Sequence, residues 1–285
     1  MVAGSSSEKG GARLNHAVLA GAGRMGSAMA RGWIHDLGAA GIGRLSVIEP
    51  SPGEDVIEAA NAKLIALNPP TEPADILVLA IKPQSFAASA DELKAWVSRQ
   101  TLVVSIMAGV TLSRISAALG CQKVARAMPN TPGAIGMGVT GFALSGACGD
   151  AENVATGKLL EPLGLVLGPL PEAQMDAVTA VSGSGPAYVF LLVEALAAAG
   201  RSVGLDEATA NALARETIIG AGALLGEFAE SPAELRKAVT SPGGTTAAAL
   251  GVLMSAGGMP DLMRKAVDAA VRRGAELSRE AEKKG

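Results

Sequence analysis

Residues 19–26, with the sequence LAGAGRMG, constrain the fold more than any other part of the chain. A β-rich run at residues 16–20 precedes them and a helical pattern follows, so Gly21, Gly23 and Gly26 form a GxGxxG turn between a strand and a helix. In such a turn the first glycine allows the sharp bend, the second lets a pyrophosphate approach the backbone, and the third lets the helix pack on the sheet. The helix N-terminus then offers unpaired N–H groups to phosphate oxygens. The segment predicts a dinucleotide-binding fold.

The rest of the chain divides into two patterns. As far as about residue 171, short apolar runs alternate with helical stretches such as residues 85–97, which is typical of βα units on a parallel sheet. Beyond it the pattern is helical and rich in Ala and Leu. We expect a disordered tail over residues 1–13, an α/β Rossmann-like dinucleotide-binding domain over 14–171 and an all-α domain over 172–285. The predicted strands are residues 16–20, 45–48, 64–67, 76–81, 102–106, 124–128, 141–144 and 165–167.

Charge and composition narrow the classes of partner. The chain carries 24 Lys plus Arg against 27 Asp plus Glu, so it offers no basic field of the kind that captures a phosphate backbone. The longest uncharged stretch, residues 127–149, is interrupted by glycines and prolines, which suits loops and strands better than a membrane span. The first thirteen residues lack the apolar core of a secretion signal. We expect a cytoplasmic protein without nucleic-acid or membrane partners.

Cysteine and histidine are too few and too scattered to indicate a metal centre. Cys121 and Cys148 lie 27 residues apart without a CxxC spacing, and the histidines are His16 and His35. The sequence therefore predicts neither a metal site nor a disulfide framework.

One segment of the helical half indicates an oligomer. Residues 217–225, TIIGAGALL, carry no charge over nine positions. A helix that is apolar all round must be buried, and a domain of about 110 residues has little interior in which to bury it. We expect this helix to pack against a second copy of the chain in a homo-oligomer.

An acidic residue stands where the adenosine ribose of a dinucleotide would be recognised. Glu49 ends the second predicted strand, and its carboxylate is suited to accept hydrogen bonds from the ribose hydroxyls and to repel a 2′-phosphate. Ser51, in the following turn, is instead suited to donate to such a phosphate. The expected cofactor is NADPH or NADH, with a modest preference for NADH predicted from Glu49. The alternative interpretation of Glu49 is a solvated loop carboxylate.

The turns after the predicted strands at residues 76–81, 102–106 and 124–128 lie where ligands bind in dinucleotide-binding folds. Ligands of a doubly wound sheet bind beyond the carboxyl ends of its strands. Residues 80–83, 107–109 and 128–132 occupy those places and offer a small or proline-fixed backbone to a flat nicotinamide. Taken singly, each is equally well explained as ordinary turn chemistry.

Few side chains are suited to proton transfer. Chemistry on a hydroxyl group usually needs a His, Lys or Tyr as proton carrier. Neither histidine follows a strand, Tyr188 lies in an apolar helical run that indicates a core position, and Lys82 precedes a proline at a strand end. The sequence favours a reaction that needs no strong protein acid, such as hydride addition to a protonated C=N bond.

A second glycine-rich segment, residues 239–246, has the sequence VTSPGGTT between two helical patterns. Ser241 is a suitable N-cap for the second helix, and Gly243 and Gly244 leave backbone N–H groups unobstructed before two threonine hydroxyls. One helix cap does not need so many hydroxyls. We interpret the segment as a carboxylate-binding site, with an ordinary helix start as the alternative.

These motifs together resemble those of the pyrroline-5-carboxylate reductase family. The resemblance extends over nearly the whole chain from Ala17 and includes GAGRMG, AIKPQ, MAGV and RAMPNTP in the same order. Its most specific parts are VSGSGPAY at residues 181–188 and PAELRKAVTSPGGTTAAALGVL at residues 232–253. It implies a Rossmann domain followed by a helical dimerisation domain. It also implies reduction of 1-pyrroline-5-carboxylate to L-proline by NAD(P)H, the last step of proline biosynthesis, in a homodimer or a homodecamer built from dimers.

The resemblance also implies roles for single residues. The TSPGGTT loop would hold the substrate carboxylate through backbone amides and Ser241, and Thr246 would bond the ring nitrogen as the catalytic residue. The substrate-binding candidates are Ser241, Gly244, Thr245, Thr246 and Asn130. The cofactor-binding candidates are Ala20, Gly21, Ala22, Gly23, Arg24, Met25, Gly26, Glu49, Ser51, Asn68, Ala80, Ile81, Lys82, Pro83, Met107, Ala108, Gly109 and Glu172.

Two departures and two alternatives accompany the resemblance. Ala238 stands where some relatives carry Asn, and Met254 where an acidic or amide side chain is usual, so details of the dimer and cofactor contacts are open. One alternative is another two-domain imine or β-hydroxyacid reductase, which would need a catalytic Lys or Asp in the helical domain; Lys237 is one candidate. The other is a non-catalytic dinucleotide-binding regulator, for which the hydroxyl-rich loop would have no use.

Overall fold

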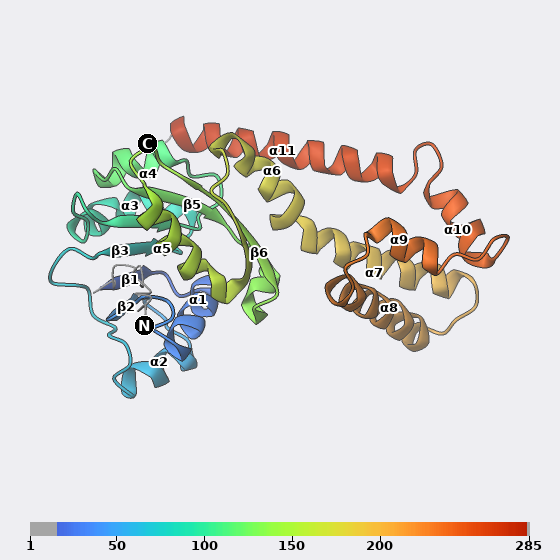
Figure 1. The fold of residues 1–285 in the computed structure, drawn as a ribbon, viewed down its shortest axis with the longest axis horizontal. Coiled ribbons are helices and arrows are strands. Elements are labelled where there is room, and N and C mark those ends of the chain that lie inside the picture. Colours follow the sequence, from blue (N-terminus) through green and yellow to red (C-terminus); the bar gives the residue numbers. More distant parts are fainter. Residues whose placement is uncertain (1–15, 284–285) are drawn as a thin grey trace, which may run out of the picture. The chain divides into compact units, whose positions relative to one another are not determined.

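The computed structural model describes residues 16–283, and the tail expected over residues 1–13 lies outside them (Figure 1). Its first part is built on a seven-stranded sheet in the order β2-β1-β3-β4-β5-β6-β7. All neighbouring strands of this sheet are parallel except β5 and β6, which are antiparallel. The strands are β1 (Ala17–Ala20), β2 (Leu45–Ile48), β3 (Ile76–Leu79), β4 (Leu102–Ser105), β5 (Val124–Met128), β6 (Gly138–Leu144) and β7 (Gly164–Leu167).

Helices cover both faces of the sheet because strand side chains alternate between two cores. On β1, Leu19 belongs to one buried cluster, with Trp33 of α1, and Val18 belongs to the other, with Phe86 of α3. Strands buried on both faces are typical of a doubly wound α/β fold, so the prediction of a Rossmann-like first half is confirmed. The helices here are α1 (Arg24–His35), α2 (Glu54–Asn61), α3 (Pro83–Ala95), α4 (Leu112–Leu119), η1 (Thr131–Ile135), α5 (Asp150–Leu160), η2 (Glu161–Leu163), η3 (Glu172–Gln174), α6 (Met175–Val178) and η4 (Thr179–Gly183).

Seven of the eight predicted strands are present, with ends shifted by up to three residues, and the strand predicted at residues 64–67 is wrong. There the chain makes only an isolated bridge between Ala66 and Ser46. Pro69 and Pro70 follow within four residues, and because proline has no N–H group the bridge is not extended into a ladder. The helix predicted at residues 85–97 is α3, which begins two residues earlier because Pro83 occupies its first turn, where a fixed φ and a missing N–H are tolerated.

The remaining elements are helical, as predicted. They are α7 (Gly185–Ser202), α8 (Glu207–Glu227), α9 (Pro232–Ala238), α10 (Thr245–Leu253) and α11 (Met259–Lys283). The described residues form two compact units, residues 16–183 with 271–283 and residues 184–270. This division differs from the one expected at residue 171, because Met175 and Ala180 are buried within the first unit and α11 returns to it.

The helices of the second unit expose large apolar side chains in the single chain. Ile219 and Leu225 of the uncharged segment in α8 are 53% exposed, and Phe190 of α7 is 62% exposed. Tyr188, expected in a core, is only half-buried. By length and hydropathy, one helical stretch among the described residues, Glu172–Ser202, is apolar enough to cross a membrane. Because a helix that meets another subunit passes the same test, these exposed faces are what a dimer interface would require.

Candidate functional site

A glycine turn joins β1 to α1 and leaves the start of that helix open. Gly21 has a φ of 95°, and a Cβ there would lie 2.7 Å from the Ala80 carbonyl group. A Cβ on Gly26 would lie 2.2 Å from the Gly21 oxygen, so α1 packs directly on the turn. At Gly23, the N-cap of α1, a Cβ would meet no atom within 4 Å, and no side chain caps the helix. The turn is closed toward the protein and open in front of the N-terminus of α1.

Glu49 lies at this turn. Its Oε2 accepts a hydrogen bond from the Ala22 N–H at 2.8 Å, and its Oε1 accepts one from the Ser51 N–H at 3.1 Å. The carboxylate is therefore held against the glycine turn by two backbone donors. This contact argues against a freely solvated loop carboxylate, and it places a negative charge beside the N-terminus of α1.

The ends of β3 and β4 lie at the same edge of the sheet as the glycine turn, because parallel strands end together. Ala80 follows β3 and packs over Gly21, and Lys82 is exposed as the N-cap of α3. After β4, Met107 is buried, and its N–H donates to Ser105 Oγ at 3.2 Å. Asn68 lies exposed in the loop that replaces the expected third strand. The structure thus brings residues 20–26, 49, 51, 80–83 and 107–109 to one edge.

Asn130 has a hydrogen bond within the protein. Its Oδ1 accepts from the Val139 N–H at 2.9 Å and so fixes the start of β6 beside η1. Its substrate-binding role was expected from the sequence, and the described structure gives its amide oxygen a role in the turn.

An ion cluster that sequence reasoning missed surrounds Glu172. Arg126 of β5 is 5% exposed, and its guanidinium lies 3.2 Å from Asp176 and 3.6 Å from Glu172. Glu172 Oε1 also accepts a hydrogen bond from the Leu112 N–H at 2.7 Å, at the first residue of α4. Glu172 therefore ties the start of α4 to the sheet. A charged residue within the apolar run VARAM was the available signal for Arg126.

His16 is buried at the opposite end of the sheet. Its ring lies 2.9 Å from Ser46 Oγ through Nε2 and 3.0 Å from an Arg44 nitrogen through Nδ1. Because the guanidinium can only donate, Nδ1 accepts and the Nε2–H donates to Ser46. Burial, followed by the nearby Arg44 charge, lowers the pKa of His16. Among residues 16–283 no group of three His, Cys, Asp or Glu side chains is placed to hold a metal ion.

The hydroxyl-rich loop lies in the second unit, between α9 and α10. The N-cap of α10 is Gly244, so the prediction that Ser241 caps this helix is wrong. The reason is a tight turn, in which Gly243 has a φ of 70° and the Gly244 N–H donates to the Ser241 carbonyl oxygen at 3.1 Å. A side chain on Gly244 would collide with the Ser241 hydroxyl. The loop presents Ser241 and two threonines at the start of α10, where backbone N–H groups lack helical partners.

Comparison with known proteins finds family models and relatives that together match most of the chain. Residues 172–277 match the family model for pyrroline-5-carboxylate reductase dimerisation, and residues 15–109 match the model described as NADP oxidoreductase coenzyme F420-dependent. A pyrroline-5-carboxylate reductase of Pseudomonas aeruginosa is 41% identical over 79% of this chain and 80% of its own length. A reductase of the same name from Coxiella burnetii is similar in structure, with a TM-score of 0.82 at 35% identity over 93% of this chain and 99% of that one. The Plasmodium falciparum pyrroline carboxylate reductase with NADP bound has a TM-score of 0.72 at 27% identity over 94% and 100% of the two chains.

Proposed function

The chain belongs to the pyrroline-5-carboxylate reductase family, and from this premise we propose how its residues act. It is an NAD(P)H-dependent oxidoreductase of proline biosynthesis that reduces the C=N bond of 1-pyrroline-5-carboxylate to give L-proline. Its dimerisation segment supports a homo-oligomer built from dimers. The observation that carries the proposal is the presence of two features in one chain. The first is an open glycine turn at a sheet edge, and the second is a hydroxyl-rich loop inside the dimerisation segment. We further propose that the enzyme works in the cytoplasm.

The glycine turn fits a dinucleotide. Gly21 and Gly26 leave no room for side chains, whereas the open space at Gly23 lets a pyrophosphate approach the uncapped N-terminus of α1. Residues 20–26 would hold the phosphates, and residues 80–83 and 107–109 would hold the nicotinamide. When bound, the reduced nicotinamide supplies a hydride.

The loop of residues 239–246 fits the substrate carboxylate. Backbone N–H groups at the start of α10 and the Ser241 hydroxyl would donate to the carboxylate oxygens, and the helix dipole favours their negative charge. Thr246 would accept a hydrogen bond from the ring N–H of the protonated imine, which fixes the C=N carbon for hydride addition. The hydride adds to that carbon, the C=N π electrons become the nitrogen lone pair, and the product is a secondary amine. No protein acid is needed, because the nitrogen arrives protonated.

The experiment that tests this assignment is steady-state kinetics of Thr246→Ala with 1-pyrroline-5-carboxylate. Loss of a hydrogen bond to a charged group costs about 1.5–3 kcal/mol, so kcat/KM for the imine should fall about 10–150-fold. Dinucleotide binding should stay within about twofold. Thr240→Ala is the matched control, because its hydroxyl already donates to the Arg236 carbonyl oxygen at 2.6 Å. Wild-type kinetics in Thr246→Ala would remove Thr246 from the mechanism, and faster turnover of a simple keto or hydroxy acid would favour the alternative reductases.

We also propose a modest preference for NADH. Glu49 accepts hydrogen bonds from the Ala22 and Ser51 N–H groups, and these would hold its charge near a bound 2′-phosphate. Solvent screens this repulsion to about 1 kcal/mol, a factor of about five. Glu49→Ser should therefore raise kcat/KM for NADPH about fivefold and lower that for NADH, whereas Glu54→Gln, an exposed acid in α2, should change neither. A native tenfold preference for NADPH would contradict the proposal.

A further inference from the structure

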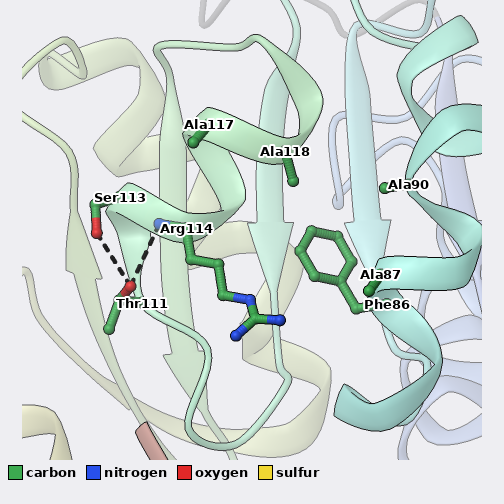
Figure 2. Close-up of a pocket in the computed structure, with 8 residues that line it drawn as sticks. All are labelled: Phe86, Ala87, Ala90, Thr111, Ser113, Arg114, Ala117 and Ala118. Carbon is green, nitrogen blue, oxygen red and sulfur yellow. Dashed lines mark hydrogen bonds between the residues drawn. The ribbon is translucent and has the colours of Figure 1, made fainter. Parts of the chain in front are cut away.

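A cavity lies between α3 and α4, apart from the residues assigned above to cofactor and substrate. Its volume is about 620 Å³, which is within the range of small-molecule sites. Five of the eight lining residues are Phe or Ala, and the remaining three are the hydroxyl residues Thr111 and Ser113 and the cation Arg114. The four alanines create the hollow because nothing longer fills the gap between the two helices. The lining residues are Phe86, Ala87, Ala90, Thr111, Ser113, Arg114, Ala117 and Ala118 (Figure 2).

Arg114 points into this cavity with an unsatisfied donor. Figure 2 shows its guanidinium reaching from α4 toward the ring of Phe86 on α3. Its Nη1 is buried and has no hydrogen-bond partner among the residues that the structure describes. Burial of an unpaired N–H of a charged group costs on the order of a few kcal/mol, and an acceptor bound in the cavity would remove that cost.

Two hydroxyl groups lie beside Arg114 at the mouth of the cavity. The cavity opens at the first turn of α4, where Thr111 Oγ1 accepts from the Arg114 N–H at 3.3 Å and lies 3.1 Å from Ser113 Oγ. The acid that touches the same helix start, Glu172, is already paired with Arg126. The site thus offers one uncompensated guanidinium beside two hydroxyls, on an apolar wall.

We propose that this cavity binds an organic anion that carries one carboxylate on an apolar body. A carboxylate accepts two parallel N–H bonds from a guanidinium, and the Phe and Ala wall takes up the hydrocarbon part. A phosphate dianion fits less well because a single cation neutralises only half of its charge, and the lining offers donors beyond the guanidinium only at the two hydroxyls.

The test uses the full-length protein and 4-(trifluoromethyl)benzoate as probe. Binding is followed by fluorine NMR, with the neutral 4-(trifluoromethyl)benzamide and inorganic phosphate as comparison ligands. The probe should bind, and the amide and phosphate should bind at least fivefold more weakly. Arg114→Gln, which removes the charge, and Ala117→Leu, which fills the hollow, should each weaken probe binding at least fivefold. Arg31→Gln, the loss of an exposed arginine paired with Asp55, is the matched control and should change nothing.

The substrate loop is a second possible carboxylate site, so Ser241→Ala is included. Probe binding that survives Ser241→Ala and is lost in Arg114→Gln supports the proposal, and so does bromine density beside Arg114 in a crystal soaked with 4-bromobenzoate. Binding that is lost only in Ser241→Ala, or that is equal for the acid and the amide, overturns it. Because these readouts do not involve catalysis, they are independent of the outcome for Thr246.

Discussion

Two substitutions in the glycine turn should separate an effect on folding from an effect on cofactor binding. Gly23→Ala adds a methyl group where no atom lies within 4 Å, at a φ of −65° that alanine adopts readily. Gly26→Ala adds the same methyl group 2.2 Å from the Gly21 carbonyl oxygen. The turn cannot move away from this methyl group, because Gly21 packs closely against the Ala80 backbone. Gly26 is therefore required for the fold, and Gly23 is required for the approach of the cofactor.

The expected magnitudes follow from these contacts. Gly26→Ala should destabilise the first unit by about 1–3 kcal/mol or more, as overpacking against rigid backbone does, and lower the melting temperature by several degrees. Gly23→Ala should cost at most about 1 kcal/mol of stability, the difference between Gly and Ala at an N-cap. It should instead weaken NAD(P)H binding about 10–150-fold, the equivalent of one charge-assisted hydrogen bond of about 1.5–3 kcal/mol.

Thermal unfolding followed by circular dichroism and calorimetric titration with NADH and NADPH measure the two effects separately. The expected pattern is a stable Gly23→Ala protein that binds dinucleotide poorly and a Gly26→Ala protein that is already destabilised without ligand. If Gly23→Ala bound both dinucleotides as the native protein does, the pyrophosphate would not approach the turn at Gly23, and the placement of the cofactor would be refuted.

Two further predictions concern buried charges. Glu172→Gln with Asp176→Asn leaves the Arg126 guanidinium buried without an anionic partner and should cost about 3–5 kcal/mol in urea unfolding. Arg126→Met leaves two partly exposed carboxylates that water can reach and should cost less, and the reverse order would contradict this reasoning. The lowered pKa of His16 means that the unfolded chain binds more protons, so stability is complete above its ordinary value of 6.5 and is lost as pH falls through 6.5 toward the folded value. Unfolding free energies between pH 7.5 and 5 should show a shallower decline in His16→Gln, and an unchanged decline would remove His16 as its source.

Local sequence predicted most of the fold because its signals are backbone requirements. The GxGxxG turn needs three glycines wherever it occurs, and strands buried on both faces read as short apolar runs. The strand expected at residues 64–67 was wrong for a reason that lay just beyond it, in the prolines at 69 and 70. A single apolar run does not reveal whether its neighbours can continue a ladder.

The positions of candidate site residues were predictable where local backbone structure determines them. They were less predictable where contacts between distant parts of the chain determine them. The position of Glu49 follows from the end of β2, but its two N–H donors depend on how that strand meets the turn. Serine is a common N-cap residue, so the sequence points to Ser241. Only the φ of Gly243 reveals that the helix starts later. The acids that neutralise Arg126 lie about 50 residues away, and a pattern with a helical or strand period cannot find them.

The return of α11 to the first unit has a consequence for synthesis. The helical unit, residues 184–270, is an insertion between two parts of the cofactor-binding unit, and a Cβ on Gly109 would contact Leu277 and Ser278 of α11. A nascent chain released from the ribosome only as far as residue 183 lacks the helix that packs beside the loop of residues 107–109. The Rossmann half therefore cannot complete its packing until α11 has been translated, and shortening the gene from its 3′ end should damage the cofactor-binding unit before it removes the helical insertion.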